Sequence, residues 1–367
     1  MKIHSFSPDG LGTGPWAAPS VVAAARPPAH SDVVVVGAGL TGLSAALTLA
    51  AHGLSVTVLD RQFGAGASVR SGGIVLGDTL EGPFPGFDAC ERRLGEWIEQ
   101  KRVECDFEWT RCLELAHDGE LPPEPIDWIE RGPVRVALAV CGAVLDPVLL
   151  LNGVLAAARS AGAVIASGFQ VDALETDGRE PVAVGPVSHV AAHQIVMATD
   201  AVSWRDEGDP WTERTLTIAL QTEAAPPDTA AAIGLGPRQP FYTRELPLLW
   251  GRPLRDGSFL FGRELVAFPW NARREAIAAS VAEAGERLAA RMRGLHPRLA
   301  ALEVRRVWAG PTARTARGVP AIVRDATMPH VRWAGGYGGH GLAQAFALGR
   351  QAAVEVLAEL SIPIRTA

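Results

Sequence analysis

The hydrophobic positions early in the chain form one continuous run followed by a spaced pattern. Val33–Val36 is a run of four valines, which is typical of a central parallel strand buried on both faces. The small and apolar residues that follow recur at helical spacing until Gly53, and a second apolar stretch covers Ser55–Leu59. The pattern over residues 31–77 therefore predicts a compact strand–helix–strand unit.

The rest of the chain alternates between helical and strand patterns. Residues 143–161 predict a helix entered at Asp146-Pro147, with the acid as N-cap and the proline at the first helical position. Alternation over 241–261 favours antiparallel strands, and 195–198 is a short buried strand. Further helices are expected over 91–103, 274–293 and 342–360, and further strands over 319–323 and 331–334.

The composition is that of a globular protein, with 48% hydrophobic and 20% charged residues. A net charge of -6 provides no basic surface for nucleic acid or an anionic membrane, so neither is expected as a partner. The apolar stretch 135–158 is interrupted by Asp146 and Asn152, which favours a buried strand and helix over a transmembrane segment. Residues 1–30 are rich in Gly, Pro and Ala and predict an arm that lies on the surface or is partly disordered.

Cysteine and histidine spacing indicates no metal site. His189 and His193 flank a predicted strand without ligand-like neighbours, and no cysteine pair has C-x-x-C or zinc-ligand spacing. No charged segment followed by a continuous apolar stretch occurs near the start, so we expect no export signal and a cytoplasmic protein. Reduced, packing thiols are expected at Cys90, Cys105, Cys112 and Cys141.

The valine run leads into a G-x-G-x-x-G pattern, Gly37-Ala38-Gly39-Leu40-Thr41-Gly42. In this pattern Gly37 permits the tight turn, Gly39 lets the backbone approach a pyrophosphate, and Gly42 lets the helix pack close to the strand. The second strand ends at Asp60, where a carboxylate accepts ribose hydroxyls and disfavours the 2′-phosphate of NADP. Strand, turn, helix, strand and acid therefore follow the order of a Rossmann dinucleotide-binding unit.

Two further glycine-rich segments favour FAD over NAD as this dinucleotide. Gly64–Gly73 follows the ribose-binding strand directly, where a long cofactor extended across the sheet needs more backbone contacts. Gly335–Gly341 precedes the last predicted helix, and so many glycines are costly in chain entropy unless something approaches the backbone closely. We expect the flavin ring over the start of this helix, whose dipole stabilises negative charge on the reduced ring.

Taken in order, these motifs resemble those of the FAD-dependent amine and amino-acid oxidoreductases related to glycine oxidase, sarcosine oxidase and D-amino-acid dehydrogenase. Within that superfamily the chain is most similar to the gamma-glutamylputrescine oxidoreductase branch. The resemblance extends from about Ala29 to Leu360. Besides the fingerprint and the late glycine segment, it rests on Gly66–Gly73, Leu145-Asp146-Pro147, Ile195–Thr199, Arg255-Asp256-Gly257, Leu260-Phe261-Gly262, His296-Pro297 and Trp308-Ala309-Gly310.

The resemblance implies an α/β protein: a Rossmann-like FAD-binding domain with a smaller α+β substrate domain built on an antiparallel sheet. We assign the FAD-binding domain to 31–90, 141–205 and 305–367, and the substrate domain to 91–140 and 206–304. The residues expected to bind the cofactor are Gly37, Gly39, Leu40, Thr41, Gly42, Asp60, Arg61, Ala67, Ser68, Arg70, Ser71, Gly72, Gly73, Thr199, Gly310, Gly336, Gly338, Gly339, His340, Gly341 and Leu342.

Departures from the family pattern bear on how FAD is held and reoxidised. Family members with covalent flavin use a cysteine near the position of Trp308 or a histidine after the first strands, and this chain has neither, so noncovalent FAD is expected. Oxidase members often place a lysine over the flavin, whereas the lysines here are Lys2 and Lys101. Oxygen is therefore not expected to be the preferred electron acceptor, and oxygen and another carrier both remain open.

Flavin-dependent oxidation of an amine requires few catalytic groups, because the α-hydrogen leaves as hydride and the resulting imine hydrolyses in water. The protein must position the C–H bond, exclude water and stabilise the reduced flavin. A small amine or amino acid is the expected substrate. The candidate catalytic residues are Tyr242, Arg263, Tyr337 and His340, and Arg244, Trp250 and Arg252 are further candidates for holding a substrate carboxylate or amine.

Three alternatives remain open at this level. An NAD-dependent dehydrogenase carries the same fingerprint. A non-catalytic flavoprotein would use FAD only to stabilise the fold. A flavin monooxygenase-like tailoring enzyme is a third, although the sequence has no second dinucleotide fingerprint for NADPH.

Overall fold

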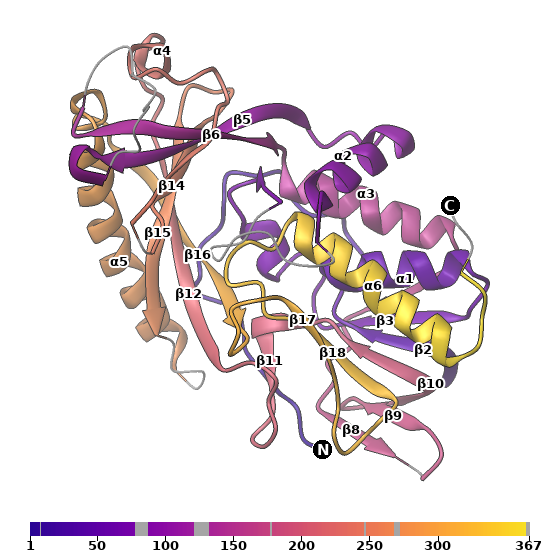
Figure 1. Ribbon diagram of the computed structural model, residues 1–367. Helices are drawn as coiled ribbons and strands as arrows, with labels where there is room; N and C mark the ends of the chain where they lie inside the picture. Colours follow the sequence, from indigo (N-terminus) through magenta and orange to yellow (C-terminus); the bar gives the residue numbers. More distant parts are fainter. Residues whose placement is uncertain are drawn as a thin grey trace.

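The computed structural model describes residues 1–7, 9–77, 87–120, 132–176, 178–245, 247–267 and 272–364. Most strands in these ranges belong to two large sheets, which form two neighbouring lobes (Figure 1). The fold is α/β, as predicted from the sequence.

The first sheet is built around the valine run. Its parallel strands lie in the order β18-β10-β2-β3-β7, and β17 pairs antiparallel with β18 at the edge. Val33–Val36 are at most 5% exposed, because β10 and β3 flank them and both faces of the sheet are covered. These strands are β2 (His30–Val36), β3 (Val56–Asp60), β7 (Val164–Ser167), β10 (His189–Met197), β17 (Ala321–Arg324) and β18 (Val331–Gly335).

A hairpin of β8 (Ala173–Thr176) and β9 (Pro181–Val184) extends this sheet. β9 pairs antiparallel with the first half of β10, and β18 pairs with the second half. Strand β10 therefore has β2 along one side and β9 followed by β18 along the other.

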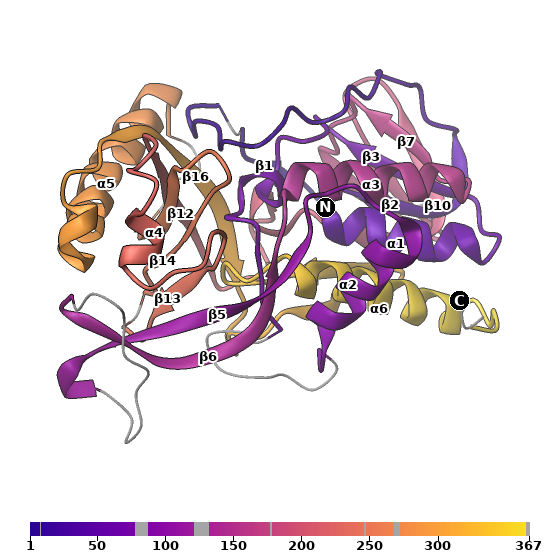
Figure 2. The same ribbon diagram turned by 90° about the horizontal axis from the view of Figure 1, so that it is seen from above.

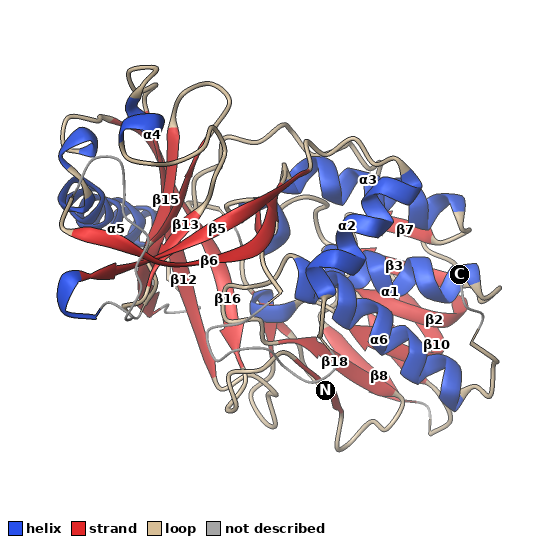
Figure 3. Ribbon diagram, turned by 45° about the horizontal axis from the view of Figure 1, so that its top comes forward, coloured by secondary structure: helices blue, strands red, loops and turns tan. Residues whose placement is uncertain are grey.

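Helices cover one face of the first sheet and share a hydrophobic core with it (Figures 1 and 3). They begin where the sequence predicts; the Asp146 carboxylate accepts the N–H groups of Val148 and Leu149 at 2.8 and 3.1 Å and starts its helix. Residues 143 and 144 of that predicted helix instead belong to the preceding strand. The helices are α1 (Leu40–Ala51), α2 (Cys90–Lys101), α3 (Pro147–Ser160) and α6 (Ala343–Glu359).

The second sheet has the order β16-β12-β15-β14-β13-β5-β6-β4, and its neighbours are antiparallel except β13 and β5. The predicted antiparallel strands over 241–261 are confirmed, and α5 (Arg274–Leu295) packs on one face through Leu288 and Met292. The strands are β4 (Ile74–Val75), β5 (Glu108–His117), β6 (Val134–Val144), β12 (Glu213–Thr222), β13 (Phe241–Thr243), β14 (Trp250–Pro253), β15 (Phe259–Ala267) and β16 (Val304–Arg314).

Short elements complete the chain. β1 (His4–Ser5) and β11 (Ser203–Trp204) pair with each other as a small separate sheet. The short helices are α4 (Thr229–Ala232), η1 (Ala67–Arg70), η2 (Asp118–Glu120), η3 (Asp200–Val202) and η4 (Pro297–Leu299).

Two segments lie in a different lobe from the one that our domain division assigns to them. Helix α2 was placed with the substrate domain, but its Trp97 ring packs against Phe346 of α6, with the ring centroids 4.9 Å apart, within the core of the first sheet. Strand β16 was placed with the FAD-binding domain, but it pairs along its length with β12 of the second sheet (Figure 2). Amphipathic patterns show that a helix or strand has a buried side, and they do not identify the element that covers it.

The N-terminal arm is more deeply buried than its composition predicts. Ile3, Phe6 and Leu11 are at most 4% exposed, and Leu11 accepts a backbone hydrogen bond of 2.7 Å from Ala309 of the second sheet. The expectation of a surface or partly disordered arm is therefore wrong for this part. Three apolar residues scattered among Gly and Pro form no periodic pattern, so the sequence does not predict that they are buried.

Two further expectations concern membrane-spanning helices and the state of the cysteines. Within the described ranges no helix is long and apolar enough to span a membrane. Cys90, Cys105 and Cys112 are buried free thiols, as expected of packing residues, whereas Cys141 is exposed.

Candidate active site

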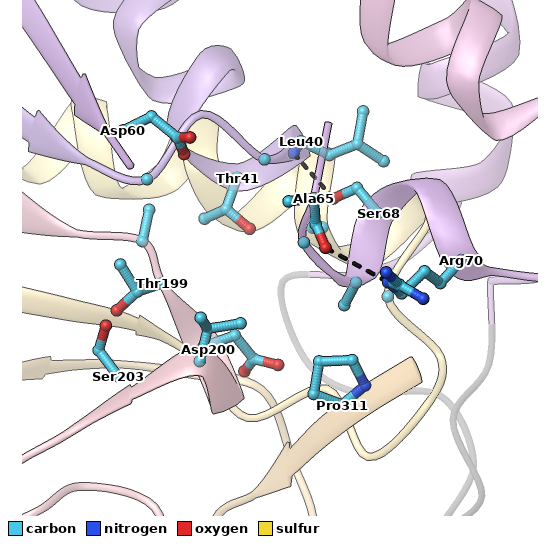
Figure 4. Close-up of a pocket in the computed structure, with 18 of the residues that line it drawn as sticks. Leu40, Thr41, Asp60, Ala65, Ser68, Arg70, Thr199, Asp200, Ser203 and Pro311 are labelled. Carbon is cyan, nitrogen blue, oxygen red and sulfur yellow. Dashed lines mark hydrogen bonds between the residues drawn. The ribbon is translucent and has the colours of Figure 1, made fainter. Parts of the chain in front are cut away.

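A cavity opens between the two lobes, at the carboxyl ends of β2, β3 and β10. Figure 4 shows Asp60 and Thr41 along one side, and Thr199, Asp200 and Ser203 along another. Ligands of open α/β sheets bind at this end of the strands, where the loops diverge.

The early glycine turn shapes one wall of the cavity. Gly37 has φ +104°, and a Cβ there would lie 2.7 Å from the Ala198 oxygen. At Gly42 a Cβ would lie 1.8 Å from the Gly37 oxygen, so strand and helix can approach this closely only without a side chain. Gly39, the N-cap of helix α1, has no side chain to cap the helix, and the first turn holds no acid. Apart from the Leu40 N–H, which Ser68 accepts, the positive end of the helix is therefore available to an anion.

Asp60 is fixed at the end of β3 by two backbone donors. Its carboxylate accepts the N–H of Ala38 at 2.7 Å and that of Gln62 at 2.8 Å. Burial raises the pKa of Asp60, and these two N–H groups act in the opposite direction. Each carboxylate oxygen has a further lone pair, so Asp60 can still accept hydroxyl groups from a ligand.

The second glycine-rich loop folds over the start of α1. Ser68 accepts the N–H of Leu40 at 3.1 Å, as drawn in Figure 4. Arg70 donates to the oxygens of Gly12, Ala309 and Ala65, which belong to the arm, β16 and its own loop. Burial lowers the pKa of Arg70 to about 10, so the guanidinium remains charged at neutral pH. This one side chain connects both lobes and the arm beside the cavity.

The late glycine segment closes the cavity from the other side. Tyr337 is 7% exposed, and its hydroxyl is 2.6 Å from the Thr41 hydroxyl in the first turn of α1. Asp200 accepts the Gly336 N–H at 2.6 Å and so joins the end of β10 to this segment. Helix α6 then begins without a side-chain cap.

Ionisable groups at this end of the cavity have shifted pKa values. Burial raises the pKa of Asp200 to about 6 and also raises that of Tyr337. Burial, together with the nearby Arg314 guanidinium, lowers the pKa of His340 to about 4. His340 is therefore neutral at pH 7, and it can exchange hydrogen bonds there but carries no charge.

Most of the predicted cofactor-binding residues lie together in the cavity wall. They come from the early turn, the second glycine-rich loop, the ends of β3 and β10, β16 and the late segment. The predicted residues that line the cavity are Gly37, Gly39, Leu40, Thr41, Asp60, Arg61, Ala67, Ser68, Arg70, Ser71, Thr199, Gly310, Gly339, Gly341 and Leu342, together with the catalytic candidate Tyr337.

The other predicted residues lie behind the wall. Gly72 packs under the Trp250 ring, where a Cβ would come within 2.3 Å of the ring, and a Cβ at Gly73 would lie 2.2 Å from the Leu145 oxygen. These two glycines, like Gly42, make room for packing. Gly336, Gly338 and His340 also lie outside the lining set.

Two of the four catalytic candidates, both on strands of the second sheet, are bound to acids. The Tyr242 hydroxyl donates to Glu114 at 3.0 Å, and Arg263 pairs with Glu245 at 3.0 Å. Neither belongs to the cavity lining. Arg244 likewise pairs with Glu114 at 2.7 Å. Strand alternation placed these residues on the correct sheet, but the face to which each points depends on register.

Several further residues line the cavity that the sequence did not predict, and most of them come from distant segments. They belong to the arm, the chain after β7, the segment after β10 and the second sheet, and no local motif marks them. These residues include Ser5, Phe6, Gln62, Phe169, Gln170, Val171, Asp200, Ser203, Thr217, Pro311 and Thr312.

The cavity has the features that a dinucleotide requires. The Thr199 hydroxyl is buried and has no hydrogen-bond partner among the described residues, although Thr199 belongs to the cavity wall. An uncapped helix start, a carboxylate at the end of β3 and an unpaired hydroxyl match the phosphate, ribose and further hydroxyl groups of FAD.

Comparison with known protein families agrees with this geometry. The family described as "FAD dependent oxidoreductase" (DAO) matches residues 32–354. The chain belongs to this family. FAD is accordingly its cofactor, and the chain contains the Rossmann-like FAD-binding domain of this family.

Individual relatives of this DAO chain are more distant. It is 30% identical over 172 residues to a probable electron transfer flavoprotein-quinone oxidoreductase, YdiS, of Escherichia coli K12. That match covers 47% of this chain and 37% of the relative, so it spans well under half of the relative's length.

Solved structures share the fold across nearly the whole DAO chain. Glycine oxidase from Geobacillus kaustophilus has a TM-score of 0.71 at 17% identity and covers 93% of this chain and 100% of its own. L-Amino acid deaminase from Proteus myxofaciens, in complex with anthranilate, has a TM-score of 0.72 at 15% identity and covers 98% and 95%. Likeness at this level of identity shows a common fold.

Proposed function

We propose that this protein oxidises a C–N bond of a small amine or amino acid to an imine, which then hydrolyses in water. The observation that carries the proposal is a single cavity that extends from Asp60 to Tyr337 and Gly339, between two uncapped helix starts. The fold shared with glycine oxidase and L-amino acid deaminase favours this substrate class.

The residues proposed to hold FAD follow the cavity in order. Asp60 would accept the ribose hydroxyls, the start of α1 with Ser68 would hold the pyrophosphate, and the start of α6 would lie nearest the ring. Noncovalent binding is proposed because this chain has neither the cysteine nor the histidine that carries covalent flavin in members of the family. When bound, FAD supplies the hydride acceptor.

The chain's own contribution is positioning and exclusion of water. Tyr337 is the catalytic candidate that lines the cavity, and its bond to Thr41 holds the late segment against α1. Thr217 and Thr312 of the second sheet line the cavity from the other lobe and provide hydroxyl groups that can orient a polar substrate. Tyr242, Arg263 and His340 do not line the cavity, and we propose that they support the residues that form its substrate side.

The electron acceptor is proposed to be a carrier in preference to oxygen. Lys2 and Lys101 are exposed, and the chain has no other lysine to place over the ring. The relative named as a flavoprotein-quinone oxidoreductase is consistent with such an acceptor, although it matches only part of this chain.

The test is an anaerobic titration of the purified yellow protein with a panel of amines and amino acids. Bleaching of the oxidised flavin band by one of them, followed by slow recovery in air and fast recovery with a quinone or carrier, is the expected result. If no amine or amino acid reduces the flavin, the proposal is wrong and a non-catalytic flavoprotein is favoured. Reduction by NADPH with oxygen consumption would instead indicate a monooxygenase.

A further inference from the structure

The opposite end of β2 from the cavity carries a cluster of ligand-type side chains. His30, Glu180 and His193 each bring a ligand atom, and these atoms all lie within 4.8 Å of one another. His30 Nε2 is 3.1 Å from one oxygen of Glu180, and His193 Nδ1 is 2.5 Å from the other. One carboxylate therefore lies between two imidazoles.

The sheet architecture places these residues together. β2 and β10 are parallel with Ala191 opposite His30, and alternate residues of a strand share a face. His30 and Asp32 of β2 therefore lie on the same face as His193 of β10. Glu180, directly before β9, reaches this face from the other side of β10.

We propose that His30, His193 and Glu180 bind a divalent transition-metal ion, with zinc as the best match. Two imidazole nitrogens and a carboxylate oxygen form a donor set that zinc uses in proteins with a fourth position open to water. Ligand bonds of about 2.1 Å in a tetrahedron place ligand atoms roughly 3.4 Å apart, so the observed separations need only small side-chain rotations. Exposed fractions of 47%, 27% and 46% for His30, Glu180 and His193 give the ion access.

Asp32 acts as a positioning residue for this site. One of its oxygens lies 3.8 Å from His193 Nε2, the ring nitrogen on the far side from Glu180. The other oxygen accepts the backbone N–H and the hydroxyl of Ser55, both at 2.7 Å, which fixes the carboxylate. A carboxylate that accepts the outer N–H of a ligating histidine orients the ring and selects its tautomer, and a small rotation of the His193 ring would bring Asp32 within hydrogen-bond distance.

The expectation from the sequence that His193 has no neighbours of the types that bind metals is wrong. His30 and Glu180 are distant from it along the chain, and only strand pairing brings them together. A metal ion here would tie the β8–β9 hairpin to β2 and β10. It would stabilise the amino-terminal end of the first sheet and leave the flavin cavity, at the other end, unchanged.

The test measures Zn²⁺ binding to the tag-free, FAD-loaded protein by competition with a chromophoric chelator. We expect one Zn²⁺ per chain, an affinity loss of about tenfold or more for His193→Ala and for Glu180→Gln, and a loss of about tenfold for Asp32→Asn. His189→Ala is the matched control, because His189 is exposed on the same strand and face and lies outside the cluster. Its affinity should equal that of the unsubstituted protein.

A second measurement identifies the ligands directly. Cu²⁺ bound in place of zinc should show electron paramagnetic resonance couplings to two imidazole nitrogens, reduced to one in His30→Ala. Zn²⁺ should raise the melting temperature of the unsubstituted protein and of His189→Ala but not of His193→Ala. Absence of a saturable site, equal affinity in Glu180→Gln, or equal loss in His189→Ala would each overturn the proposal, whichever substrate the flavin oxidises.

Discussion

Two glycine-rich segments face each other across the cavity, and they need glycine for different reasons. In the early turn, side-chain atoms would overlap with backbone: a Cβ at Gly42 would lie 1.8 Å from the Gly37 oxygen. In the late segment, a Cβ at Gly339 would meet nothing within 4 Å, but the backbone there has φ +99°. Gly42 provides space, while Gly339 provides a conformation.

This difference determines how each position responds to substitution. Overlap with a backbone oxygen can be relieved only by moving a strand or a helix of the core. Where the surroundings are open, replacing a glycine of positive φ by another residue costs only the local strain of the backbone. Gly42 should therefore tolerate no substitution, and Gly339 should tolerate some.

The largest effect is expected for Gly42→Ala. The new methyl group would push α1 away from β2, and we expect a loss of about 4 kcal/mol in the free energy of unfolding, measured by urea denaturation. Gly66→Ala is the control, because a Cβ there meets nothing within 4 Å and its φ is -76°. If both variants unfold at the same urea concentration, the packing role of Gly42 is wrong.

The second-largest effect is the pH dependence that Asp200 gives to the free energy of unfolding. The Asp200 pKa of about 6 lies above the usual aspartate pKa of 3.8, so the folded protein holds this proton more tightly than the unfolded chain does. The stability contributed by protonated Asp200 is therefore present below about pH 4 and is lost as pH rises to about 6.

Asp200→Asn should remove this loss, because asparagine is uncharged, tolerates the φ of +45° and can accept the Gly336 N–H. Relative to the unsubstituted protein, the variant should gain on the order of 2 kcal/mol between pH 4 and pH 7. The check is urea unfolding of both apoproteins across this range. The opposite slope from His340, whose pKa is lowered to about 4, cancels in the comparison. A difference that is constant with pH would contradict the prediction.

Gly339→Ala should cost about 1.5 kcal/mol, the strain of a left-handed residue, and the protein should still fold. Gly339 lines the cavity, so the Kd for FAD is measured on the same samples by fluorescence. A loss of stability as large as that of Gly42→Ala would remove the distinction between the two segments.

Asp60→Ala should weaken FAD binding by about tenfold, because the ribose acceptor is lost and two backbone N–H groups lose their partner. Equilibrium dialysis of FAD measures it, with Asp60→Asn as the control that retains an acceptor. Full flavin occupancy in dilute Asp60→Ala protein would show that the ribose lies elsewhere.

The smallest effect concerns the hydrogen bond that joins the two segments. Tyr337→Phe should cost about 1 kcal/mol, and a double-mutant cycle with Thr41→Val should assign most of it to the 2.6 Å contact. Additive single-variant effects would show that the two hydroxyls do not stabilise each other.

Much of the cofactor half could be predicted because its determinants are close in sequence. The valine run, Gly37, Gly42 and Asp60 belong to one strand–helix–strand unit, and each contact between them follows from backbone geometry. The substrate half could not be predicted in this way. Tyr242 and Arg263 lie on the expected strands, yet pair with Glu114 and Glu245.

By itself, the sequence determined the order of the elements, the turn that receives the cofactor and the carboxylate at the end of β3, because these depend on local periodicity and on the steric properties of glycine. Tertiary structure alone decided that Phe6 of the arm and Thr217 of β12 line the same cavity. It also decided that His30, Glu180 and His193 meet at the other end of the sheet. Contacts between distant segments are selected by packing and strand pairing, and no single segment of sequence records them.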